Sequence, residues 1–143
     1  MRKSDLIVFM ILIIACNSSN SKSQIQKKND AVEKTTEFSF DSEMHNFGKI
    51  KSGEIVIYSF VFTNTGKYNL SVKDVKIDCG CIKANFAKKP VKPGEKGLIE
   101  VEFDTSGLFG NQFKSIIVEA NVPEPKQLAI FAQVNNEQLK ITY

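Results

Sequence analysis

The chain has 143 residues, which is enough for one domain with appendages but too few for two full hydrophobic cores. Its 19 Lys and Arg side chains stand against 16 Asp and Glu side chains. The resulting net positive charge is too small to indicate nucleic acid as a partner, and no nucleic-acid partner is expected.

Residues 1–15 have the features of a secretory signal peptide. Arg2 and Lys3 precede an unbroken apolar run of ten residues from Leu6 to Ala15. A helix that spans a bilayer core needs about 20 apolar residues, so this run is too short to cross. A basic start, a short apolar run and a small residue at its end predict export and cleavage.

Cys16 follows Ala15 directly, and the sequence Ile13-Ile14-Ala15-Cys16 resembles the lipobox of bacterial lipoproteins. The resemblance implies that Cys16 becomes the first residue and carries acyl chains, which anchor a protein stably when there are two or more. The alternatives are an ordinary signal peptide with a coincidental cysteine and a short membrane anchor. We expect the protein to be exported and to be anchored in the cell envelope by its lipid, facing the periplasm.

Residues 16–37 form the second predicted region, the lipidated cysteine and a flexible tether. The stretch after Cys16 is rich in Asn, Ser, Lys and Gln and has almost no large apolar side chains. Such a segment cannot offset the conformational entropy that ordering costs. Its expected role is to hold the domain away from the membrane.

The third region, residues 38–143, is predicted to be an all-β domain. Short runs rich in Val, Ile, Phe and Tyr alternate here with Gly, Pro, Asn and Asp, and no long helical stripe occurs. The architecture that this pattern favours is an immunoglobulin-like Greek-key β-sandwich of about seven strands. The strands are expected near residues 38–40, 54–63, 70–77, 82–86, 97–103, 113–121, 127–134 and 138–143.

Two of these runs predict which faces are buried. Ile99, Val101 and Phe103 alternate with glutamates, which is typical of a strand with one buried face. The run 55–62 is apolar at nearly every position, so burial on both faces is expected there.

Several sequence blocks, in the same order, resemble the domain of unknown function DUF1573, a family common in Bacteroidota. The resemblance covers residues 40–135 and implies an exported, immunoglobulin-like fold similar to ASH and PapD-like domains, without implying an activity. One departure is Ile82, because the family usually has Thr after its Cys-x-Cys. The blocks are Phe47-Gly48-Lys49-Ile50, Gly53-Glu54, Phe60–Gly66, Leu70, Asp78-Cys79-Gly80-Cys81, Pro93–Gly97, Val101–Thr105 and Gly110.

Cys79 and Cys81 are the only pair with reactive potential. In an extended strand their Cα atoms would lie about 7 Å apart, near the upper limit for a disulfide, and Gly80 can bend the chain to close the gap. One hypothesis is a reducible thiol pair, and another is a copper(I) site of two thiolates. Zinc is disfavoured because the chain has one His. The structural alternative is a pair of buried thiols or a local staple.

His45, the single histidine, is expected in a turn or edge that leads into the first long strand, with no catalytic role. No nucleophile elbow accompanies it, so the protein is not expected to be an enzyme or to bind a cofactor. The leading hypothesis is a membrane-tethered binding or scaffolding module that contacts protein partners through its sandwich edges or loops. The competing hypothesis is a thiol-redox or copper(I)-handling protein that uses Cys79 and Cys81.

Overall fold

The computed structural model describes residues 34–135, and all of its regular structure is β-strand. No helix in this part of the chain is long and apolar enough to cross a membrane. Eight strands follow one another: β1 Phe38–Phe40, β2 Met44–Lys51, β3 Ile55–Asn64, β4 Val72–Ile77, β5 Ile82–Phe86, β6 Lys96–Asp104, β7 Gly110–Ala120 and β8 Lys126–Asn135.

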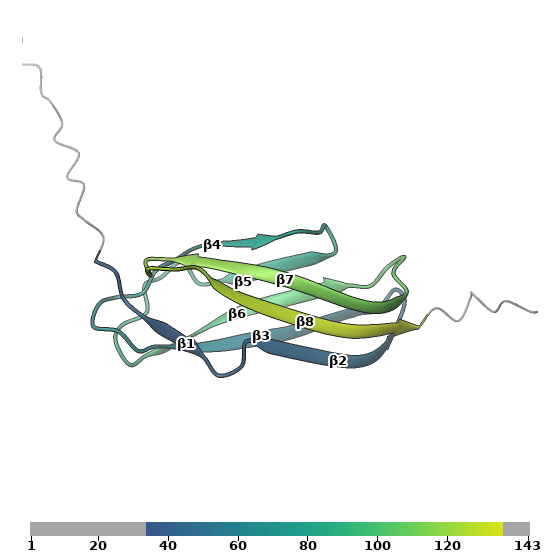
Figure 1. Cartoon of the computed structure of the whole chain (residues 1–143), viewed down its shortest axis with the longest axis horizontal. Coiled ribbons are helices and arrows are strands. Elements are labelled where there is room, and N and C mark those ends of the chain that lie inside the picture. The colour runs from purple at the N-terminus through teal and green to yellow at the C-terminus, as the bar shows by residue number, and fades with distance from the viewer. Residues whose placement is uncertain (1–33, 136–143) are drawn as a thin grey trace, which may run out of the picture. The chain divides into compact units, whose positions relative to one another are not determined.

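The strands form two sheets of four, which lie as two layers in Figure 1. One sheet has the order β1-β3-β6-β5 and the other has the order β2-β8-β7-β4. All neighbours are antiparallel except β2 and β8, which run parallel. The predicted all-β immunoglobulin-like sandwich is therefore confirmed.

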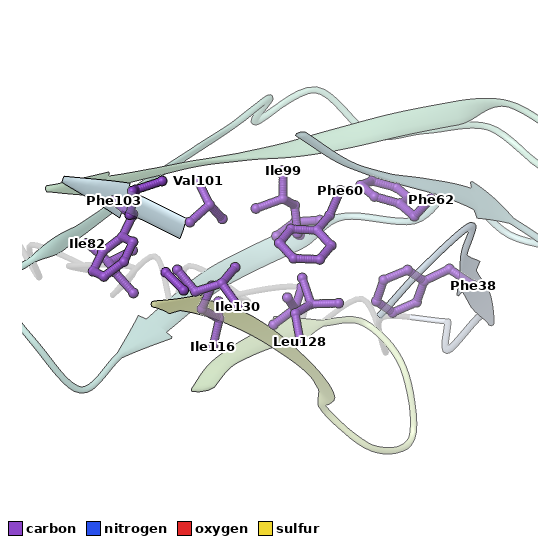
Figure 2. Packing of buried hydrophobic residues seen from close by; sticks show 14 of the residues in the cluster. Phe38, Phe60, Phe62, Ile82, Ile99, Val101, Phe103, Ile116, Leu128 and Ile130 are labelled. Atoms are coloured by element: carbon purple, nitrogen blue, oxygen red, sulfur yellow. The ribbon is translucent and has the colours of Figure 1, made fainter. Parts of the chain in front are cut away.

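The core lies between the two sheets. Figure 2 shows Phe60, Ile99 and Val101 pointing from one sheet toward side chains of the other. Alternation along each strand produces this layer, because every second side chain points to the same face. The opposite side of the core is supplied by Ile116, Leu128 and Ile130, all at most 1% exposed.

Strand β2, at one edge of the β2-β8-β7-β4 sheet, was not among the predicted strands. Its periodicity is broken by an irregularity between Asn46 and Lys49, where Gly48 takes a φ of 72°. The Asn46 side-chain oxygen accepts a hydrogen bond from the Gly48 N–H at 2.8 Å. His45 therefore lies within a strand rather than before one, and its imidazole ring stacks on the ring of Tyr58.

The prediction that β3 is buried on both faces is wrong. Phe60 and Phe62 face the core, but Ile55 and Ile57 are 58% and 56% exposed. Nothing among residues 34–135 covers the outer face of this sheet at that point. Although β3 has apolar residues on both faces, only the face toward the core is buried, and the outer face is exposed at Ile55 and Ile57.

Contacts with the sandwich extend to the residues just before Phe38. Thr36 is buried, and its N–H donates to the Asn121 carbonyl at 2.9 Å. The Glu37 carbonyl accepts from the N–H groups of Thr65 and Gly66, both at 3.0 Å. The signal peptide, Cys16, most of the tether and the strand expected near 138–143 lie outside the described residues.

Candidate functional site

Cys79 and Cys81 form a disulfide in the turn that joins β4 to β5. Their Cα atoms are 5.3 Å apart, within the range of ordinary disulfides, so the turn does close the gap that an extended strand would leave. Both residues are half-buried against the core. The Cys81 carbonyl accepts a hydrogen bond from the Asp104 N–H at 2.9 Å, which ties the turn to the end of β6.

In this oxidised form neither sulfur is a thiolate. Copper(I) binding therefore requires prior reduction, and the redox and copper hypotheses both remain predictions. No cluster of three or more His, Cys, Asp or Glu side chains suited to a metal occurs within residues 34–135.

A second feature is the backbone edge of β3. The short strand β1 pairs only with Phe62–Asn64, and the chain then crosses to the other sheet as β2. Residues 55–60 pair with β6 on one side, and no strand among the described residues pairs with them on the other. This stretch of β3 is therefore an open sheet edge, which we call the free edge of β3.

The direction of the backbone groups follows from one hydrogen bond. The Val61 carbonyl accepts from the Asp41 N–H at 2.9 Å on the β1 side. Backbone groups of successive residues in an antiparallel strand point alternately to its two neighbours. The N–H and C=O groups of Ile55, Ile57 and Ser59 therefore point outward along the free edge.

On the outer face, acidic side chains lie beside this edge. Asp104, Glu102 and Glu100 of β6 are directly opposite Ile55, Ile57 and Ser59 of β3. Glu102 forms an ion pair with Lys83 of β5 at 2.9 Å. The free edge of β3 thus has two exposed isoleucines in front of an acidic row.

On the inner face, the edge is lined by half-buried aromatic rings. The rings of His45 and Tyr58 are stacked with centroids 3.6 Å apart, and the Phe47 ring meets His45 edge-on at 4.6 Å. Burial disfavours the charged imidazolium and lowers the pKa of His45 below its ordinary value. The inner side of the edge is therefore apolar and is uncharged near neutral pH.

Comparison with protein families decides the family of the chain. The model of the family described as "Protein of unknown function (DUF1573)" matches residues 38–134, about two thirds of the sequence. The chain belongs to the DUF1573 family. The resemblance seen in the sequence is thus confirmed for the family and its fold. No curated protein sequence matches this DUF1573 chain.

Solved structures from several organisms share the fold of this DUF1573 domain. A protein of unknown function from Porphyromonas gingivalis W83 is 19% identical, with a TM-score of 0.62. The match covers 70% of this chain and 47% of that protein, so the chain spans about half of its length. The ASH/PapD-like domain 7 of human CEP192 is 10% identical over 71% of this chain and 87% of its own, with a TM-score of 0.54.

The CupB2 chaperone of Pseudomonas aeruginosa is 15% identical over 72% of this chain and 57% of its own, with a TM-score of 0.52. At these identities the likeness establishes the fold and nothing further. The DUF1573 domain thus shares the immunoglobulin-like sandwich fold of these structures.

Sequence reasoning located the cysteine pair but missed the free edge of β3. The sequence signal for this edge is the apolar outer row of β3, to which periodicity alone assigns a buried face. Strand order decides whether such a row is covered, and the switch of the chain from β1 to β2 is not visible in local periodicity.

Proposed function

We propose that this protein is a membrane-tethered, non-catalytic binding module of the cell envelope, which accepts an extended segment of a partner protein as an added strand. The observation that carries the proposal is the free edge of β3, where Ile55 and Ile57 are exposed and their backbone groups point outward. Strand addition satisfies such groups with main-chain hydrogen bonds and leaves specificity to the alternating side chains.

The surroundings of the edge define the partner segment. An added strand would place every second side chain against Tyr58, His45 and Phe47, so these positions should be apolar. The remaining side chains would lie outside, beside Ile55 and Ile57. Lys or Arg suits these positions, because the aliphatic stem covers isoleucine while the charge faces the acidic row of β6.

The fold supports this role by analogy. Solved structures that share the fold include a protein described as a chaperone and an ASH/PapD-like domain, and also the VesB protease of Vibrio cholerae, in which the matched part is 31% of the chain. An edge that is left open is otherwise a liability for aggregation, which proteins normally blunt with charges, proline or a cover. Ile55 and Ile57 carry no charge themselves, and no strand among residues 34–135 pairs with this side of β3.

The tether is the second part of the proposal, and it rests on the lipobox-like sequence before Cys16. Replacement Cys16→Ser removes the thiol that acylation requires, so the chain should move from the membrane fraction to the soluble periplasmic fraction. Fractionation with immunoblotting measures this, and Ser18→Ala is the matched control that should remain with the membrane. Membrane retention of Cys16→Ser would contradict lipid anchoring.

Strand addition is tested with a designed probe, a nine-residue fluorescent peptide with Ile at odd and Lys or Thr at even positions. The full chain in detergent should bind it, as measured by fluorescence anisotropy. Ile57→Pro removes the outward N–H without touching the ladder to β6, so the fold should persist while affinity falls at least about tenfold.

Ile57→Thr is the matched control, because it keeps the N–H and favours a strand; it should retain affinity within about threefold. A second variant, Ile57→Lys, keeps the backbone N–H but sets a positive charge against the lysines of the probe, so affinity should fall. Equal affinity of all four proteins, or failure of the unmodified chain to bind, would overturn strand addition at this edge.

A further inference from the structure

The sequence that follows β8 has the pattern that the free edge of β3 requires of an added strand. Apolar and polar residues alternate strictly there, in the order Gln138, Leu139, Lys140, Ile141, Thr142 and Tyr143. Such alternation predicts an extended segment with one apolar face. The segment would therefore present apolar side chains to the inner side of the edge and a lysine to the acidic outer side.

Strand β8 ends beside the start of this edge. β2 and β8 run parallel and end side by side at the right of Figure 1, where Lys51 is level with Asn135. The Asn135 carbonyl accepts from the Ser52 N–H at 2.9 Å. The turn that contains Ser52 leads into Ile55, the first residue of β3. Residues 136–143 therefore start at the end of the sandwich where the free edge begins.

The connection is long enough for these residues to reach the edge. From Asn135 to Leu139 the chain can extend up to about 14 Å. That length is enough to cross the turn 51–54, whose ends are less than about 7 Å apart, and to move one strand spacing of about 4.8 Å beyond β3. β3 runs back from this turn, so a segment that reverses after Asn135 runs parallel to β3.

We propose that residues 139–143 of this chain cover the free edge of β3 in cis, as a parallel strand beside residues 55–59. The inference rests on the proposed function, because the same edge must accept a strand. It adds a regulation, since a partner segment has to displace residues 139–143 before it binds. The chain's own segment is favoured over that of a second copy, because a short connection gives it an effective concentration in the millimolar range.

The reach of the connection sets the register, with Lys140 level with Ile55. Hydrogen bonds of a parallel pair join each residue of one strand to the two residues that flank its neighbour on the other. The Ile55 N–H therefore donates to the Leu139 carbonyl, and the Ile55 carbonyl accepts from the Ile141 N–H. The Ile57 N–H donates to the Ile141 carbonyl. These bonds satisfy backbone groups that otherwise point outward along the edge.

The side chains of the edge suit this register on both faces. On the outer face, Lys140 lies beside Ile55, and Asp104 of β6 is level with Ile55 on its other side. The lysine stem covers the exposed isoleucine while its ammonium faces the carboxylate. On the inner face, the apolar side chains of the added strand lie against Val56 and Tyr58, which are half-buried.

The cover is weak enough for a partner to displace it. Ordering five residues costs conformational entropy that offsets most of the gain from hydrogen bonds and burial. We expect the covered form to exceed the open form about tenfold, so the edge amides still exchange rapidly compared with the paired amides of β6. A ligand that needs the open form has its apparent dissociation constant raised by about the same factor.

Proline at alternate positions of the segment tests the cover. Ile141→Pro removes the N–H that donates to β3, so the nine-residue peptide should bind the full chain in detergent about tenfold more tightly by fluorescence anisotropy. Thr142→Pro is the matched control, because the Thr142 N–H points away from β3, where proline is tolerated. Its affinity should stay within about threefold of the unmodified chain. Both changes lie beyond β8, so the sandwich should keep its thermal unfolding midpoint.

The outcomes separate this inference from the proposed function. Equal peptide affinity of all three proteins would leave strand addition standing and overturn the cover. If none of them binds the peptide, strand addition fails, and amide exchange without peptide decides the cover. Ile55 and Ile57 should exchange about tenfold faster in Ile141→Pro than in the other two proteins, and equal rates would overturn the cover. A difference that grows with protein concentration would assign the segment to a second copy and overturn the arrangement in cis.

Discussion

Asn64 shows how a single buried polar side chain closes one end of the sandwich. It is fully buried, and its amide donates to the carbonyls of Tyr68 and Val91, both at 2.8 Å. Its side-chain oxygen accepts from the Thr36 hydroxyl and the Gly66 N–H, both at 3.1 Å. One residue thus satisfies groups on three loops and joins the start of the domain to the end of β3.

Replacement Asn64→Ala removes these four hydrogen bonds, although the Gly66 N–H still donates to the Glu37 carbonyl and the Val91 carbonyl still accepts from the Leu70 N–H. The free energy of unfolding should fall by about 3–5 kcal/mol, since each buried group that loses its partner costs about 1–3 kcal/mol. Urea unfolding followed by circular dichroism measures the change. Asn85→Ala, on the outer face of β5, is the control and should stay within about 0.5 kcal/mol. A similarly small change at Asn64 would refute its structural role.

His45 makes stability depend on pH. Burial lowers its pKa in the folded protein, so the unfolded chain binds the proton more readily. As the pH falls through about 6.5, the free energy of unfolding should decrease, and the loss is complete below the folded-state pKa. Above about pH 7.5 both states are neutral and His45 has no effect.

His45→Phe keeps the ring stacked on Tyr58 and removes the titration. The drop in the free energy of unfolding between pH 7.5 and pH 5 should be larger for the original chain than for this variant. Equal drops would mean that His45 is not the group responsible.

Among the elements, the strands with one apolar face were predicted most reliably. In β6 the alternation of Ile99, Val101 and Phe103 with polar residues matches their complete burial. The strand β2 escaped prediction because its irregularity at Gly48 interrupts the alternation. The free edge of β3 escaped because pairing between strands is a long-range property, whereas periodicity is local.

The turn between β4 and β5 carries the alternative hypothesis, thiol chemistry at Cys79 and Cys81. If the disulfide is a structural staple, Cys79→Ser with Cys81→Ser should lower the free energy of unfolding by at most about 2 kcal/mol, the chain-entropy estimate for so short a loop. Peptide binding should be unchanged.

The redox state is measured by intact mass after alkylation, with and without reductant, on protein from the periplasm, with metal analysis of the same sample. An easily reduced bond, or stoichiometric copper on the reduced pair, would favour the thiol hypothesis. A bridge that resists mild reductant would favour the staple.

For the whole molecule, the sequence was sufficient to predict the fold, because short apolar runs separated by turn residues have few ways to bury their faces. It was not sufficient to predict which surfaces stay open. The exposed rows at Ile55 and Ile57 and at Phe113 and Phe131 belong to opposite outer faces of the sandwich. Local sequence marks these residues as apolar, and only the topology shows that nothing within residues 34–135 covers them.

The central claim is that the free edge of β3 accepts a strand, and backbone hydrogen exchange tests it most directly. In the full chain without peptide, the amides of Ile55, Ile57 and Ser59 should exchange rapidly, since their N–H groups point outward. Saturation with the Ile/Lys peptide should slow all three at least about tenfold, while the already paired amides of β6 change little. Unchanged exchange at these three amides in the presence of bound peptide would contradict the account.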